Sequence, residues 1–72
     1  MQIEWERNFS IRVGVRDGEV TLSANRDGLL SLARIFTALA EEPPGSHIHL
    51  DEHNSLEECS SELIVERMEG NL

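Results

Sequence analysis

The chain has 72 residues, of which 39% are apolar and 28% are charged. This length fits one small domain, because about 100–150 residues is usual, and it excludes a catalytic domain joined to a separate cofactor domain. The apolar share is that of a globular chain rather than a disordered one. We therefore expect residues 1–72 to form a single domain with an aliphatic core, since Trp5, Phe9 and Phe36 are its only aromatic residues.

The charge of the chain is distributed unevenly. Fourteen acidic residues against six basic residues, all of them arginine, give a formal net charge of −8. Residues 1–40 hold five acids and five arginines, whereas residues 41–72 hold nine acids and only Arg67. An acidic surface repels nucleic acid and anionic membranes and attracts basic partners. The C-terminal half is thus a candidate binding surface, although acidic side chains also serve simply to keep small proteins soluble.

Cysteine content and the N-terminal residues bear on the compartment. The single cysteine, Cys59, cannot form an intrachain disulfide, which is typical of a protein from a reducing compartment. No apolar stretch approaches the roughly 18 residues of a membrane span. Residues 1–7 lack the basic start and the apolar run of a signal peptide. We expect a cytoplasmic protein that requires no cofactor.

Alternation of apolar and polar residues predicts three strands before residue 25. The first covers about residues 2–6, where Ile3 and Trp5 alternate with polar neighbours. The second and third, residues 9–16 and 19–24, flank the dipeptide Asp17-Gly18. This dipeptide favours a two-residue hairpin turn. Both central residues of such a turn need a positive φ angle, which Asp and Gly tolerate better than most residues.

The register of this hairpin follows from its turn. A two-residue turn pairs Val15 with Val20 and Val13 with Leu22, so apolar residues meet on one face of the hairpin. We expect both Val13 and Leu22 to be buried beneath a helix.

Apolar residues at helical spacing predict one helix over about residues 26–41. Asn25 is a suitable N-cap, and Asp27 places a negative charge in the first turn, where the helix dipole favours it. Gly28 is a weak helix former, but the first turn tolerates it. The prolines in residues 43–45 end the helix. The stripe expected to pack on the sheet consists of Leu29, Leu32, Ala33, Phe36, Leu39 and Ala40, widened by Leu30, Ile35 and Ala38.

Two more strands are predicted after the helix, at about residues 46–52 and 62–68. Between them, Ser55 and Glu58 have the spacing of a capping box, which predicts a single helical turn. The inward face of the last strand stays open, since either Leu63 and Val65 or Ile64 and Met68 can face the core. The order strand–strand–strand–helix–strand–strand indicates an α+β fold: a mostly antiparallel sheet of about five strands with one helix packed on one face.

The densest polar segment contains all three histidines of the chain, at positions 47, 49 and 53. On a strand, the side chains of His47 and His49 point the same way, and their Cα atoms lie about 6.5–7 Å apart. The two imidazoles can therefore chelate one metal ion, with Asp51 or His53 as a third ligand. They can equally be surface residues on the solvent face of a strand whose core face is Ile48 and Leu50. A metal- or ligand-binding module built on His47, His49 and Asp51 is therefore our alternative function.

Catalysis has little support in the sequence. Cys59 and His53 could serve as nucleophile and base, but no third orienting residue, glycine-rich loop or phosphate cradle accompanies them. Arg12 and Arg16 lack aromatic neighbours, unlike the residues of a nucleic-acid platform. We expect a non-enzymatic protein that binds neither nucleic acid nor membranes.

Three segments together resemble the immunity protein 32 family of bacterial polymorphic toxin systems: residues 23–33 (SANRDGLLSLA), 44–52 (PGSHIHLDE) and 61–65 (SELIV). The resemblance covers about residues 20–68. It implies a small cytoplasmic protein that binds and neutralises a cognate toxin, and it carries over no catalytic residue.

The acidic C-terminal half fits this implied function, because it would attract a basic toxin. A third interpretation is a homodimer formed through an exposed sheet edge or face, since so small a core gains stability from association. The expected partner-binding residues are His47, His49, Asp51, Glu52, His53, Glu57 and Glu58.

Overall fold

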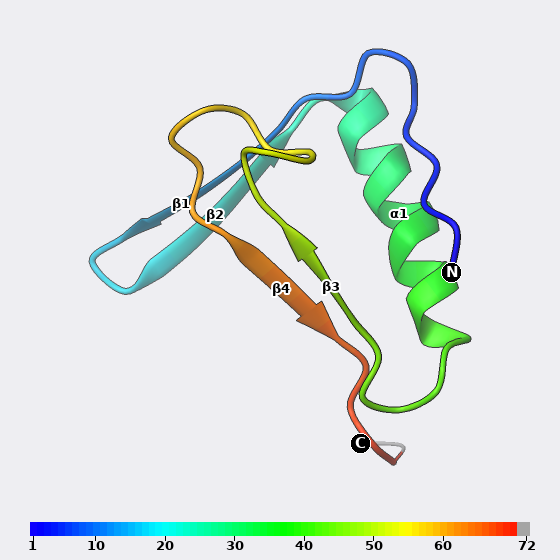
Figure 1. The fold of residues 1–72 in the computed structure, drawn as a ribbon. Helices are drawn as coiled ribbons and strands as arrows, with labels where there is room; N and C mark the ends of the chain where they lie inside the picture. The colour runs from blue at the N-terminus through cyan, green and yellow to red at the C-terminus, as the bar shows by residue number, and fades with distance from the viewer. Residues whose placement is uncertain (71–72) are drawn as a thin grey trace.

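The computed structural model describes residues 1–70, which form two β-hairpins and one helix (Figure 1). In chain order the elements are β1 (Ile11–Arg16), β2 (Glu19–Ala24), α1 (Arg26–Ala40), β3 (His47–Leu50) and β4 (Leu63–Glu66). β1 pairs only with β2, and β3 only with β4, in both cases antiparallel. The α+β class is confirmed. The expected single sheet of about five strands is wrong, because the described residues contain four strands in two separate sheets.

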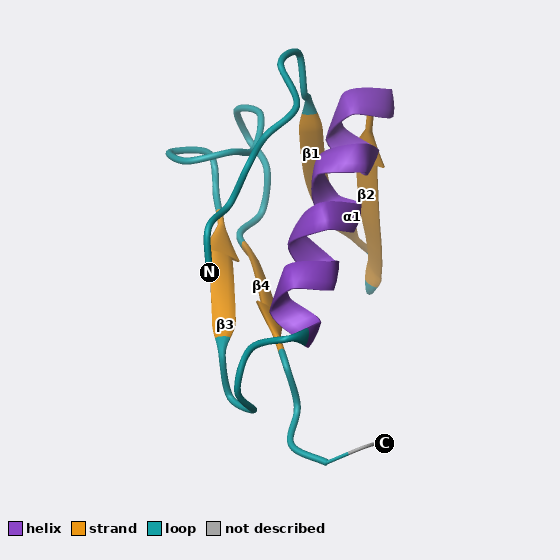
Figure 2. Cartoon of the chain, turned by 90° about the vertical axis from the view of Figure 1, so that its right-hand side faces the viewer, coloured by secondary structure: helices purple, strands orange, loops and turns teal. Residues whose placement is uncertain are grey.

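The N-terminal segment is not the strand that its alternating pattern predicts. The Trp5 ring stacks on the Phe9 ring at a centroid distance of 4.5 Å, and both half-buried rings pack against the core. The Glu6 N–H donates to the Ser31 hydroxyl on α1 at 2.7 Å. The segment is therefore held against α1 and the core, and it forms no strand before β1; Figure 2 shows it running along one side of the helix.

The predicted hairpin register is confirmed, with Val15 opposite Val20 and Val13 opposite Leu22. Asp17 and Gly18 have φ angles of 50° and 79°, as the two-residue turn requires. Val13 is 2% exposed, but Leu22 is 37% exposed, so the expected burial of Leu22 is wrong. The physical reason is visible in Figure 1, where the hairpin extends beyond the helix and its tip points away from it.

The two hairpins are joined at one end and separate at the other. The Ile11 carbonyl accepts from the Glu57 N–H at 2.9 Å, and the Val13 carbonyl accepts from the Ser61 N–H at 2.8 Å. Beyond these contacts β1 and β4 diverge (Figure 1). This divergence splits what the alternation pattern predicts as one sheet into two.

The predicted helix and its N-cap are confirmed. The Asn25 side chain accepts from the Gly28 N–H at 2.7 Å, and the helix ends at Ala40. The inward row is rotated from the predicted stripe, since Leu29 and Phe36 are exposed. A side chain at Gly28 would meet the Ser10 carbonyl oxygen at 2.6 Å. This close packing fixes the rotation of α1, and its buried residues are Gly28, Ser31, Leu32, Ile35 and Leu39.

The core lies between α1 and the inner faces of the two hairpins, and it is aliphatic as expected. Its buried members are Ile11, Val13, Leu32, Ile35, Ile48, Leu50 and Leu56. The open question of the last strand is resolved, because Leu63 and Val65 pack against this core whereas Ile64 and Met68 are exposed.

Candidate functional site

The candidate site is the acidic loop, residues 51–62, which connects β3 to β4. It carries five acidic residues and no lysine or arginine: Asp51, Glu52, Glu57, Glu58 and Glu62. All of these except the half-exposed Asp51 are exposed. The loop therefore gathers much of the net negative charge of the chain on one accessible segment.

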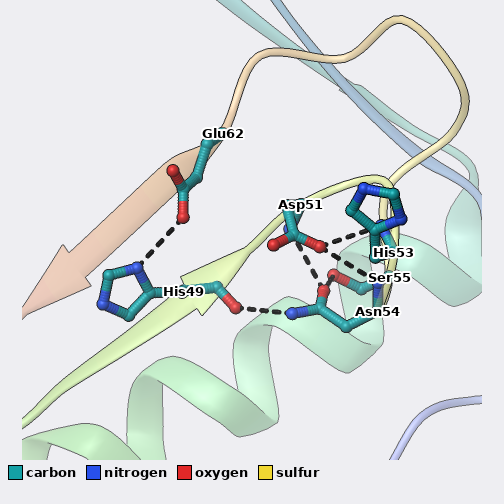
Figure 3. Close-up of polar contacts among 6 residues, drawn as sticks. All are labelled: His49, Asp51, His53, Asn54, Ser55 and Glu62. Carbon is teal, nitrogen blue, oxygen red and sulfur yellow. Dashed lines mark hydrogen bonds and ion pairs between the residues drawn. The ribbon is translucent and has the colours of Figure 1, made fainter.

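The first half of the loop is ordered by Asp51 and Asn54 (Figure 3). The Asp51 carboxylate accepts from the N–H groups of His53 and Asn54, at 2.8 and 3.1 Å. The Asn54 side chain accepts from the Asp51 N–H at 3.1 Å and donates to the His49 carbonyl at 2.9 Å. These bonds form a polar turn, which the capping-box pattern does not predict.

The predicted helical turn is accordingly wrong, because no helix forms between β3 and β4. The Ser55 hydroxyl donates to the Asn54 side chain, so it does not cap a following turn. Asn54 offers both a donor and an acceptor in its amide, and it satisfies the main chain locally in place of a helix.

The second half of the loop is braced at several points. The Glu52 carboxylate accepts from the Cys59 N–H at 3.0 Å, across a turn in which Cys59 has a φ angle of 68°. The Glu57 and Ser61 N–H groups bond to β1, and Leu56 is buried in the core. The loop is therefore held by the Glu52 carboxylate, by two main-chain bonds to β1 and by one apolar anchor, Leu56.

The acidic side chains consequently fall into two groups. Those of Asp51, Glu52 and Glu62 accept hydrogen bonds that hold the loop and its flanking strands. Those of Glu57 and Glu58 make no hydrogen bond or ion pair with residues 1–70 and are exposed to solvent. Of the predicted contact acids, Glu57 and Glu58 are the two whose charge is free for a partner.

His47 and His49 lie on the solvent face of β3, while Ile48 and Leu50 are buried on the opposite face. The two rings meet edge to face with centroids 5.1 Å apart. His49 Nδ1 lies 3.0 Å from the Glu62 carboxylate, a contact also visible in Figure 3. A carboxylate only accepts, so this nitrogen donates and the contact holds the ring against the start of β4.

The geometry does not favour the metal alternative. Residues 1–70 contain no group of three or more His, Cys, Asp or Glu side chains placed to hold a metal ion. Asp51, the expected third ligand, directs its carboxylate to the main chain of the following turn.

Cys59 and His53 do line one feature of the surface, an open depression of about 300 Å³, together with Glu52 and Glu58. Cys59 is an exposed free thiol. The two side chains share no hydrogen bond in the described part of the chain, and no third residue orients the imidazole. This arrangement lacks the base–nucleophile contact that covalent catalysis uses.

Sequence reasoning missed two residues of the site, Asn54 and Glu62. Glu62 could have been found from the register, because His49 pairs with Ile64 and Glu62 lies diagonally opposite on the same face. The bracing role of Asn54 has no comparable signal, since its partners are main-chain groups.

These features define a small α+β fold that presents a braced, acidic loop. The sequence model of immunity protein 32 matches residues 19–68, and the chain therefore belongs to the immunity protein 32 family. This confirms the resemblance noted from the sequence. No curated protein and no solved structure matches the chain. Within residues 1–70, no helix has the length and apolar character needed to cross a membrane.

Proposed function

We propose that this protein neutralises a cognate toxin by binding it through the acidic loop, without catalysis. Membership of the immunity protein 32 family supports a toxin-neutralising role. The observation that carries the choice of surface is the braced loop with two exposed, unpaired carboxylates, Glu57 and Glu58. The partner surface that complements it is basic, and the encounter takes place in the cytoplasm.

Bracing matters for affinity because a loop that is ordered before binding loses little conformational entropy on association. The Glu52 contact to the Cys59 N–H and the two bonds from the loop to β1 supply this order. The exposed carboxylates then steer a basic partner toward the loop, which raises the association rate at low salt.

The expected contact residues acquire different roles in this account. Glu57 and Glu58 contact the partner directly, together with His53, which lines the same depression as Glu58, while His47 and His49 add contacts on the solvent face of β3. Asp51 and Glu52 act as positioning residues, because their carboxylates accept main-chain hydrogen bonds inside the loop. Their loss would weaken binding by loosening the loop rather than by removing a contact.

Growth protection tests the proposal. The cognate toxin, identified by pull-down with this protein from its native host, is expressed in cells that carry either the natural chain or the double variant Glu57→Lys, Glu58→Lys. The matched control is Glu4→Lys, Glu41→Lys, which changes the net charge equally at exposed acids outside the loop. We expect protection by the natural chain and the control, and loss of protection with the loop variant. Equal protection by all three would refute the loop as the binding surface.

A further inference from the structure

The outer edge of β2 is an open strand edge. In a hairpin with a two-residue turn, Arg16 and Glu19 form two main-chain hydrogen bonds with each other. From there along each strand, the N–H and C=O groups of successive residues point alternately toward the partner strand and away from it. The main-chain groups of Val20 and Leu22 therefore point away from β1. No described residue outside β1 is hydrogen-bonded to the main chain of residues 19–23. Figure 2 shows β2 at the outer margin of the molecule, on the side of β1 that faces away from β3 and β4.

The other edge of the same hairpin is covered, which makes the contrast informative. There the Ile11 and Val13 carbonyls accept from the main chain of the acidic loop at 2.9 and 2.8 Å. These contacts agree with the alternation of main-chain groups described above, because the carbonyls of Ile11 and Val13, two odd-numbered residues of β1, point away from β2. The hairpin therefore has one closed edge, at β1, and one open edge, at β2.

Apolar side chains surround the open edge. Val15, Val20 and Leu22 share the face of the hairpin that continues the core, and they are 58%, 64% and 37% exposed. Val15 and Val20 are thus among the most exposed large apolar residues of the described chain.

We propose that the β2 edge binds the β2 edge of a second copy of this chain, in antiparallel orientation, to form a four-stranded sheet across the dimer. The pairing that uses the whole strand is centred on Leu22. It places Leu22 opposite Leu22 of the second copy and Val20 opposite Ala24 on the apolar face. On the polar face it places Thr21 opposite Ser23, and it brings no two like charges together.

Charge makes the β2 edge the place where a second copy meets little repulsion, and the pairing of β2 with itself matches apolar with apolar and polar with polar residues. Two chains of net charge −8 repel each other over most of their surfaces. The hairpin, residues 11–24, carries no net charge, because Arg12 and Arg16 balance Asp17 and Glu19. Association through β2 also keeps the acidic loops apart, since each loop lies on the β1 side of its hairpin. The inference is thus independent of toxin binding.

Sedimentation velocity over a wide concentration range tests the dimer. We expect a reversible monomer–dimer equilibrium whose dissociation constant rises about tenfold or more in Val20→Lys, because an edge lysine opposes strand pairing. The matched control is Ile64→Lys, at a β4 residue with a similar exposed fraction of 54%, and it should leave the equilibrium unchanged. Circular dichroism verifies that each variant is folded.

A second variant tests the main chain itself. Leu22→Pro removes an N–H that points away from β1, so the hairpin keeps its own bonds while the dimer loses a donor. We expect this variant to be folded and monomeric. A natural chain that is monomeric at every concentration would overturn the proposal. So would a dimer that Val20→Lys leaves intact and Ile64→Lys disrupts.

Discussion

Gly28 lies directly against the main chain of Ser10, so that a Cβ atom at position 28 would come within 2.6 Å of the Ser10 carbonyl oxygen. The same atom would lie 3.0 Å from the Ala24 and Ile11 side chains. The glycine thus allows the N-terminus of α1 to sit on the start of the first hairpin. That contact sets which row of helix residues faces the core.

Gly28→Ala should therefore destabilise the protein although alanine is the better helix former. We expect a loss of about 1–3 kcal/mol in the free energy of unfolding, because main-chain atoms cannot move aside as a flexible side chain can. Urea unfolding measures the change. A variant as stable as the natural chain, or more stable by the roughly 1 kcal/mol of helix propensity, would show that the contact relaxes freely.

Asn25→Ala should cost about 2 kcal/mol, at the upper end for an N-cap. Its side chain accepts from the N–H groups of Gly28 and Ser10, at 2.7 and 3.0 Å, and donates to the Asn8 carbonyl at 2.8 Å. Asn25→Asp keeps both acceptor contacts and should recover most of the loss in thermal or urea unfolding. Equal destabilisation by the two variants would contradict the capping role.

Two leucines of the helix offer a matched test of its rotation. Leu32 is 3% exposed and Leu29 is 55% exposed. Leu32→Ala should lower the free energy of unfolding by about 2–5 kcal/mol, because it leaves a cavity in the core. Leu29→Ala should cost about 0.5 kcal/mol or less, as is usual at the surface. Comparable losses in urea unfolding would mean that α1 has another rotation.

The fold was predictable from the sequence where neighbouring residues alone specify the local structure, as turn and helix-capping residues do. Asp17-Gly18 fixed the turn and hence the pairing of Val13 with Leu22, and Asn25 marked the start of the helix. The rotation of α1 was not predictable, because Leu29 and Leu32 both fit an apolar stripe. The choice between them depends on the tertiary contact of Gly28 with Ser10.

The strand at residues 2–6 was predicted wrongly for a similar reason. Alternation of Ile3 and Trp5 describes a segment with one buried side, but it does not say what buries that side. In the structure Trp5 stacks on Phe9, and the segment bonds to Ser31. In the candidate site, the exposure of Glu57 and Glu58 followed from composition. The loop bracing did not, because side-chain to main-chain bonds leave no periodic pattern.

Exchange of both His47 and His49 for alanine should leave the melting temperature nearly unchanged. Both side chains are exposed, and the surface pair of His49 with Glu62 contributes little. Zinc and chelator should likewise have no effect on the natural chain, since residues 1–70 contain no group of three or more His, Cys, Asp or Glu side chains placed to hold a metal ion. A zinc-dependent rise of several degrees in a thermal shift assay, lost in the double variant, would establish the metal-binding alternative.

The most direct test of the central claim is surface plasmon resonance between this protein and the cognate toxin recovered with it from the native host, at low and high salt. We expect binding that weakens as salt rises, because charges on the exposed loop are screened over about 8–10 Å. Glu57→Lys, Glu58→Lys should slow association strongly, whereas Glu4→Lys, Glu41→Lys should retain nearly natural rates. Binding that is independent of salt and equal for the two variants would contradict recognition through the acidic loop.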